Sequence, residues 1–212
     1  MTAVVEPSPL ESDRFGLRIG RCVVPGVDRL DRLAEACEGF DVVVLRYPAE
    51  DVDVPVVLAG LDRFRCLPAD HLCVWGWTGD EPPSRPAPAG RTIDMSPVID
   101  DVSSVVRDSL AGYSTHYRAN PLLAPTAALD GYVEWARHLA AEDDGAVVLR
   151  DAGGIADGLA LIDWRAGPPD IRLAGMRTSA QGRGLYPVLI AHVIGLALRR
   201  GADGVQISTQ SH

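Results

Sequence analysis

Apolar segments alternate with polar ones along the chain and predict two groups of secondary-structure elements. In the first group, apolar stretches at residues 17–24, 41–46 and 66–77 predict strands. Residues 27–37 and 55–61 predict helices, the first because Leu30, Leu33 and Ala34 recur at helical spacing. Strands that alternate with helices indicate a small, open α/β unit.

The second group has a different order of elements. Residues 91–95 predict a strand, and residues 97–110 and 129–140 predict two helices. Three strands follow, joined by turns rich in glycine or proline, and this spacing favours an antiparallel meander. The strands span residues 146–150, 155–164 and 171–178, and a helix at 184–200 and a strand at 204–209 complete the group. The order β-α-α-β-β-β-α-β predicts an α/β fold with a mixed sheet.

A proline-rich segment separates the two groups. Residues 81–90 contain Pro82, Pro83, Pro86 and Pro88, and this segment cannot form a regular hydrogen-bonded ladder. We therefore predict an N-terminal α/β half-domain at residues 1–80, a linker at 81–90 and a second domain at 91–212. The first part is too short to bury a large core, so it is expected to depend on the second.

Charge and composition exclude several function classes. The formal net charge is −9, which disfavours a general affinity for nucleic acid or anionic membranes. All 20 basic residues are arginine, so lysine chemistry is impossible. The N-terminus has neither a basic nor an apolar leader, and no stretch is long enough to cross a bilayer, which predicts a cytoplasmic protein. The spacing of the four cysteines and the histidines predicts no metal site.

The segment from Met176 to Tyr186 is the most informative part of the chain. It connects the strand at 171–178 to the following helix through Gln-Gly-Arg-Gly. Pro187 has no amide hydrogen and therefore fits the first turn of that helix, which places the helix start near Gly184. Glycines at this point allow a ligand to approach the unpaired amides at the positive end of the helix dipole.

Two interpretations of this segment remain open. It is either a glycine-rich connection that binds nothing, or an anion site in which Arg183 adds a positive charge suited to a pyrophosphate. It is not a dinucleotide fingerprint, because GxGxxG is absent, and it is not a Walker loop, because that loop requires a lysine.

The element order and this loop together resemble the GNAT superfamily of acyl-CoA-dependent N-acyltransferases. The family's Q/R-x-x-G-x-G/A loop is matched by Gln181 and Gly184, with Gly182 and Arg183 between them. Tyr186 departs from the pattern, because a small residue is usual there. The superfamily resemblance covers roughly residues 91–210 and implies a GNAT fold preceded by the small half-domain.

The chain is also similar to the TDP-fucosamine acetyltransferase branch, whose members carry a degenerate half-domain before the GNAT domain. This similarity rests on Phe15-Gly16, on residues 113–120, on Tyr132-Val-Glu-Trp135 and on Thr209-Gln210. The family continues beyond this point with a helix and two strands, so we expect residues 91–212 to be a C-terminally incomplete domain. The strand at 204–209 would then be an exposed edge, which predicts either a truncated product or a homodimer that pairs through this last strand.

The resemblance also implies a co-substrate and its binding residues. Acetyl-CoA is expected as co-substrate, with the main chain of Met176 and Thr178 contacting the pantetheine and the thioester carbonyl. The residues expected to bind it are Met176, Arg177, Thr178, Gln181, Gly182, Arg183, Gly184, Leu185 and Tyr186. The amine is expected to attack the thioester directly, and backbone donors are expected to stabilise the oxyanion.

The sequence leaves the general base undecided. Glu134, His116 and Asp163 are the titratable candidates, and each also has an ordinary structural interpretation: a solvated helix face, packing of a loop or a surface carboxylate. His116, Tyr117 and Gln210 are the candidates for contact with the acceptor. Neither a nucleophilic triad nor a metal signature is present in the spacing of the residues.

These observations predict an acyl-CoA-dependent N-acetyltransferase that acts on a small primary amine, such as a nucleotide-linked amino sugar. A catalytically silent module that binds acyl-CoA or a protein partner is the alternative from a different class. A third hypothesis is a GNAT enzyme for another amine, such as an antibiotic or a protein N-terminus.

Overall fold

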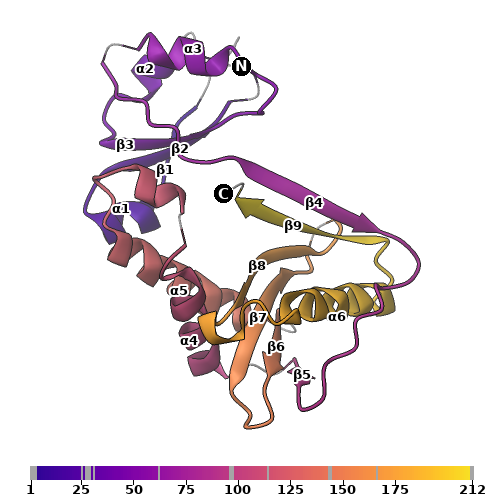
Figure 1. Cartoon of the computed structure of the whole chain (residues 1–212). Helices are drawn as coiled ribbons and strands as arrows, with labels where there is room; N and C mark the ends of the chain where they lie inside the picture. The colour runs from indigo at the N-terminus through magenta and orange to yellow at the C-terminus, as the bar shows by residue number, and fades with distance from the viewer. Residues whose placement is uncertain are drawn as a thin grey trace. The chain divides into compact units, whose positions relative to one another are not determined.

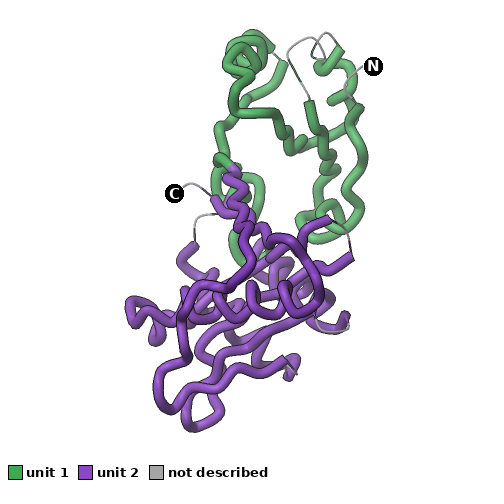
Figure 2. Tube along the Cα trace, turned by 90° about the vertical axis from the view of Figure 1, so that its right-hand side faces the viewer, with its two compact units in different colours: residues 1–71, 116–127 green, residues 72–115, 128–212 purple. Residues whose placement is uncertain are grey.

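The computed structural model describes residues 4–24, 26, 30, 32–61, 63–95, 98–113, 115–142, 145–165 and 167–210. Contacts between residues divide the chain into two units, which Figure 2 shows in two colours. Unit 1 combines residues 1–71 with 116–127, and unit 2 combines residues 72–115 with 128–212. The division differs from the expected boundary at residues 81–90 and assigns a segment of the second predicted domain to unit 1.

Unit 1 contains a three-stranded sheet with short helices. Strand β1 pairs antiparallel with β2, and β2 pairs parallel with β3. A cluster of buried apolar residues that includes Cys22, Val24, Leu33 and Val54 forms its core. The elements are β1 (Glu6–Pro7), α1 (Pro9–Phe15), β2 (Ile19–Val23), α2 (Leu33–Ala36), β3 (Val42–Arg46) and α3 (Val54–Ala59), and a 3-10 helix at His116–Ala119.

Unit 2 contains a six-stranded sheet in the order β4-β9-β8-β7-β6-β5 (Figure 1). All neighbouring strands are antiparallel except β8 and β9, which are parallel. The predicted meander is therefore confirmed in β6, β7 and β8. The elements are β4 (Leu72–Thr78), β5 (Thr92–Asp94), α4 (Ile99–Leu110), α5 (Pro125–Ala140), β6 (Ala146–Arg150), β7 (Ala156–Asp163), β8 (Asp170–Met176), a 3-10 helix (Thr178–Ala180), α6 (Leu185–Arg199) and β9 (Gly204–Gln210).

Both faces of the central strands are buried, which explains why β6 and β7 are almost continuously apolar. Val147 and Leu149 of β6 pack in the cluster that contains α6, whereas Ala146 and Val148 pack in the cluster of α4 and α5. Successive side chains of a strand point to opposite faces, so these clusters lie on opposite sides of the sheet. We call them the α6 face and the α4–α5 face.

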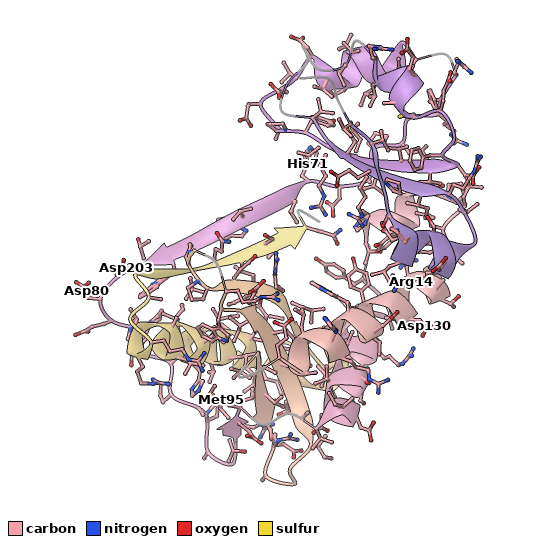
Figure 3. The ribbon with its side chains drawn as sticks, turned by 180° about the vertical axis from the view of Figure 1, so that it is seen from behind. Arg14, His71, Asp80, Met95, Asp130 and Asp203 are labelled. Atoms are coloured by element: carbon pink, nitrogen blue, oxygen red, sulfur yellow. The ribbon has the colours of Figure 1, made fainter. Side chains whose placement is uncertain are left out.

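Strand β9 is an interior strand, and the expectation that it would be an exposed edge is wrong. It pairs along its whole length with β4, from Leu72 opposite Gln210 to Thr78 opposite Gly204. The edge position is filled by β4, which comes from the part of the chain before the proline-rich segment. In Figure 3, the labelled residues Asp80 and Asp203 mark the end of this strand pair at which β4 finishes and β9 begins. The basis for a homodimer through β9 is therefore removed.

Most other predicted elements agree with the structure to within a few residues. The helix predicted at 27–37 is α2 in its last part, whereas residues 27–29 and 31 lie outside the described residues. The strand predicted at 66–77 begins later, at Leu72, and belongs to unit 2. Helix α1 was not predicted; Pro9 starts it, and Gly16 ends it in the left-handed conformation with φ 65°.

Candidate functional site

Strands β8 and β9 separate shortly after they begin to pair. Their parallel register contains only Asp170 opposite Gln206 and Ile171 opposite Ile207. Strand β8 nevertheless continues to Met176, and β9 continues to Gln210, as Figure 1 shows. The peptide groups on this side of β8 therefore lack a neighbouring strand and are available to another partner. The sequence pattern did not predict this separation.

The loop that follows β8 contains two glycines in the left-handed region. Gly182 has φ 70° and Gly184 has φ 69°, a conformation that strains residues with a side chain. No atom lies within 4 Å of the position that a Cβ would take at either glycine, so the loop is open on that side. The side-chain amide of Gln181 donates a hydrogen bond to the carbonyl of Met176 at 3.1 Å and so fixes the loop to the end of β8.

This loop presents unpaired amides at the positive end of α6. Within the described residues, the backbone N–H groups of residues 182–186 make no hydrogen bond. Helix α6 starts at Leu185 with Pro187 in its first turn, as predicted. Arg183 is exposed beside these amides, and no carboxylate in the described part of the chain pairs with it. The arrangement is suited to an anionic group.

A shallow cavity of about 350 Å³ lies against the loop. Of the predicted coenzyme residues, Met176, Gln181, Gly182, Gly184, Leu185 and Tyr186 line it, together with Gly175, Ala180 and Pro187. The structure therefore brings most of the predicted binding residues together around one cavity. Burial, and then the neighbouring Tyr113, raise the pKa of Tyr186, so its phenol stays protonated at neutral pH.

Arg177 and Thr178 are already engaged by other parts of unit 2. The Arg177 guanidinium donates to the Ala156 carbonyl at 2.6 Å and to the Ser104 hydroxyl at 2.8 Å. The Thr178 amide donates to a carboxylate oxygen of Asp108 at 2.5 Å. Arg177 therefore fixes β8 to β7 and α4, and the Thr178 amide is available to a ligand only when its bond to Asp108 breaks.

Asp108 was not singled out in the sequence, although one signal points to it. It lies in the last turn of α4, where the negative end of the helix dipole disfavours a carboxylate. In the structure its hydrogen-bond partner is the amide of Thr178, 70 residues further along the chain.

The three candidates for a general base lie in different places. Glu134 is exposed on α5 and lines a second cavity, of about 320 Å³, with Arg107, Asp130, Val133 and Arg137. Asp163 forms ion pairs with Arg165 and Arg172. The hydrogen bonds from Arg165 hold the pKa of Asp163 well below its usual range.

The register of β7 and β8 separates Asp163 from the glycine loop. Asp163 is opposite Asp170 at the start of β8, whereas Gly158 is opposite Met176 at its end. Six residues of extended strand span about 20 Å. Asp163 therefore lies at the far end of β8 from the cavity.

His116 and Tyr117 belong to unit 1. The Tyr117 hydroxyl donates to a carboxylate oxygen of Glu11 at 2.7 Å, which makes Tyr117 part of a buried polar network. His116 packs against the Tyr117 ring at a centroid distance of 4.0 Å. Burial lowers the pKa of His116 to about 4, so the imidazole is neutral at pH 7. Its Nε2 atom is buried and has no partner among the described residues.

Gln210 is the last residue of β9, on the other side of the separation from β8. Its side-chain carbonyl oxygen is buried and has no hydrogen-bond donor within residues 4–210 as far as the structure describes them. In that same part of the chain, no group of acidic, histidine or cysteine side chains is arranged to hold a metal ion. No described helix is both long and apolar enough to span a bilayer.

Comparisons with known proteins show likeness in structure but not in sequence. No protein-family model matches the chain, and no curated protein matches it. Among solved structures, a GCN5-related N-acetyltransferase from Sphaerobacter thermophilus matches with a TM-score of 0.60 at 18% identity, covering 80% of this chain and 51% of the other. The chain thus spans about half the length of that protein.

Two further structures match along most of this chain. A GCN5-related N-acetyltransferase from Kribbella flavida has a TM-score of 0.54 at 16% identity and covers 90% of this chain and 71% of its own. A functionally unknown conserved protein from Staphylococcus epidermidis has a TM-score of 0.60 at 13% identity and covers 92% and 75%. At this level of identity the likeness concerns the fold. The chain has the mixed α/β fold of the GNAT acetyltransferases.

Proposed function

We propose that this protein is an acyl-CoA-dependent N-acyltransferase that transfers an acetyl group to a primary amine of a small molecule. The observation that carries the proposal is the loop at residues 181–184, where two left-handed glycines leave a row of unpaired amides facing a cavity at the end of β8. The likeness of the fold to GCN5-related N-acetyltransferases supports it, as does the position of this loop after β8, the strand that separates from β9 in this chain.

The loop and the neighbouring strand suit the two ends of the proposed co-substrate. The amides of residues 182–186, the dipole of α6 and the Arg183 side chain would hold the pyrophosphate. The peptide groups of β8 that β9 leaves unpaired would hold the pantetheine arm by main-chain hydrogen bonds. The thioester supplies an activated carbonyl, and the residues of the chain bind and orient it.

The proposed reaction is a direct transfer. The amine loses a proton and attacks the thioester carbonyl, the C–N bond forms and the C–S bond breaks, and the thiolate takes up a proton. A nucleotide-linked amino sugar is the acceptor suggested by the sequence resemblance, and it belongs in any panel of amines.

The loop assignment can be tested by adding a negative charge to it. We expect Gly184→Asp to raise the dissociation constant for acetyl-CoA at least about tenfold, because a carboxylate would occupy the anion site. Aspartate tolerates the left-handed region better than most residues, which limits the strain. Gly154→Asp is the matched control: Gly154 has φ 81°, equally open surroundings and a place in the turn between β6 and β7.

Isothermal titration calorimetry of the three proteins with acetyl-CoA measures this difference. Equal affinities for Gly184→Asp and Gly154→Asp would show that the loop does not hold the coenzyme, and failure of the wild-type protein to bind would overturn the proposed function.

A coenzyme-binding module without catalysis is the second candidate. It is favoured by the hydrogen bond between the Thr178 amide and Asp108, which occupies one main-chain donor expected near the thioester. Release of free thiol, followed with a thiol reagent over a panel of primary amines, separates the two candidates. Binding of acetyl-CoA without thiol release across the panel would favour the module.

A further inference from the structure

The last turn of α4 packs against the end of β8 on the α4–α5 face. The Asp108 carboxylate accepts the Thr178 amide. One residue further on, Ser109 approaches Gly175 so closely that a Cβ there would lie 2.8 Å from its Oγ. Beyond the helix, Tyr113 is near enough to Tyr186 to influence its pKa. The end of α4 therefore borders the same strand end and the same helix start as the cavity.

The Asp108 carboxylate forms no ion pair within the described chain. Its neighbour Arg107 pairs with Asp130 at 2.8 Å, and Arg177 is held by Ser104 and the Ala156 carbonyl. The hydrogen bond from Thr178 reaches one carboxylate oxygen, and within the described residues no other hydrogen bond or ion pair reaches the side chain. Other carboxylates of unit 2, such as Asp101 and Asp157, pair with arginine.

The location at the helix end strengthens the attraction for a cation. The C-terminal end of a helix carries a partial negative charge, so Asp108 and the dipole of α4 add to each other. Such a charge is unfavourable in the empty protein, and a bound ammonium group would relieve it. A compact ammonium can also donate to the carboxylate oxygen that Thr178 does not occupy.

The glycine loop and Asp108 lie on opposite faces of the sheet, near the point where β8 separates from β9. The glycine loop leads into α6 on one face, and Asp108 lies on α4 on the other. Strands β8 and β9 are unpaired between them beyond Ile171 and Ile207. A ligand anchored at the loop could therefore present its reactive end, through the separation, to a second ligand on the α4–α5 face.

We propose that Asp108 is a specificity-determining residue that binds the ammonium group of a cationic acceptor. The proposal rests on the proposed acyltransferase function. Asp108 holds the protonated amine, which then loses a proton to water, and the neutral amine attacks the thioester with formation of the amide and release of the thiol. Asp108 thereby selects aliphatic amines, which are positively charged at neutral pH, over uncharged arylamines.

The test compares Asp108→Asn with Asp100→Asn. Both variants remove one carboxylate from α4, but Asp100 is exposed in its first turn. Asparagine retains a carbonyl oxygen that can accept the Thr178 amide. Thiol release from acetyl-CoA is measured with two sets of acceptors. Benzylamine, glucosamine and a nucleotide-linked amino sugar are the cationic acceptors, and aniline is the uncharged one. The affinity for acetyl-CoA is measured by calorimetry.

For Asp108→Asn we expect kcat/KM for the cationic amines to fall about tenfold or more, mainly through KM, while the aniline reaction and the acetyl-CoA affinity stay unchanged. Asp100→Asn should behave like the wild-type protein. Asp108→Glu retains the charge and should retain the preference for cationic amines, so it also provides a readout if the asparagine variant folds poorly.

Several outcomes would overturn the proposal. An equal loss with aniline and with the cationic amines would indicate a structural role for Asp108, and identical behaviour of the two asparagine variants would exclude any role. If the wild-type protein binds acetyl-CoA but transfers the acetyl group to none of the aliphatic amines, the proposed role of Asp108 would be overturned, whereas coenzyme binding would stand. Absence of acetyl-CoA binding would overturn the proposed function itself.

Discussion

At the scale of single residues, Glu11 is a carboxylate of unit 1 that accepts several hydrogen bonds. It is 4% exposed and accepts hydrogen bonds from Ser8, from two nitrogens of Arg21 and from the Tyr117 hydroxyl, all at 2.6–2.7 Å. Burial by itself raises the pKa of Glu11, but these donors outweigh burial and lower the pKa to about 2. The network thereby joins α1, β2 and the 3-10 helix at His116–Ala119.

We expect Glu11→Gln to lower the free energy of unfolding by about 3 kcal/mol, because it leaves the Arg21 guanidinium partly buried without its carboxylate. Tyr117→Phe removes one hydrogen bond and should lower it by about 1 kcal/mol. Glu35→Gln is the control, since Glu35 forms an exposed ion pair with Arg32 and should change stability by less than about 0.5 kcal/mol. Urea unfolding followed by circular dichroism measures all three, and equal values for Glu11→Gln and Glu35→Gln would contradict the prediction.

At the scale of elements, β4 shows how two positions on the same face of an edge strand, Trp75 and Trp77, differ in burial. Trp77 packs against the apolar cluster on the α6 face. Trp75 is 63% exposed, and its indole N–H donates to the Thr209 hydroxyl at 3.2 Å. Strand β4 therefore contributes to the core through one aromatic ring, whereas the other lies largely in solvent.

This difference predicts unequal effects of the same substitution. Trp77→Ala should destabilise the protein by about 3 kcal/mol, because it removes packing from the core. Trp75→Ala should change the stability by about 1 kcal/mol or less, because it loses mainly a surface hydrogen bond. The midpoints of denaturant unfolding compare the two variants. A larger loss for Trp75→Ala than for Trp77→Ala would contradict the assignment of the core contact to Trp77.

The sequence predicted the elements better than their pairing. Residues 146–150 and 155–164 are predominantly apolar, and this local composition predicts them as strands, which the structure has at Ala146–Arg150 and Ala156–Asp163. Pro187 similarly placed the start of α6 and, with it, the glycine loop. The partner of β4 is more than 120 residues away in the chain, and nothing local to residues 72–78 indicates β9. Asp108 and Thr178 meet across 70 residues, so this part of the site also depended on the tertiary structure.

At the scale of the whole molecule, we expect the two units to respond differently to acid. In unit 1, burial, then Arg21 and Arg46, lower the pKa of His116 to about 4, whereas Glu11 and Asp70 oppose this effect. A neutral histidine with a lowered pKa stabilises the folded state above pH 6.5, and that stability is lost as the pH falls towards 4. The contribution of Glu11 is present above pH 4.5 and is lost as the pH falls towards 2.

We therefore expect unit 1 to lose structure first on acidification, with each group contributing at most about 3 kcal/mol. The four tryptophans, at positions 75, 77, 135 and 164, all belong to unit 2. Far-ultraviolet circular dichroism should consequently change at a higher pH than tryptophan fluorescence. Replacement of His116 by Gln should shift the first change to lower pH, and coincident transitions in the wild-type protein would contradict this order.

The antiparallel pairing of β4 and β9 also determines how unit 2 would respond to mechanical force. Leu72 and Gln210 are register partners at the same end of the two strands. A force that pulls these residues apart would break the hydrogen bonds between the two strands one after another, starting from this end. A force applied between Thr78 and Gln210, at opposite ends, would load them together in shear. Unit 2 should therefore open at a lower force when it is pulled at Leu72 and Gln210 than when it is pulled at Thr78 and Gln210.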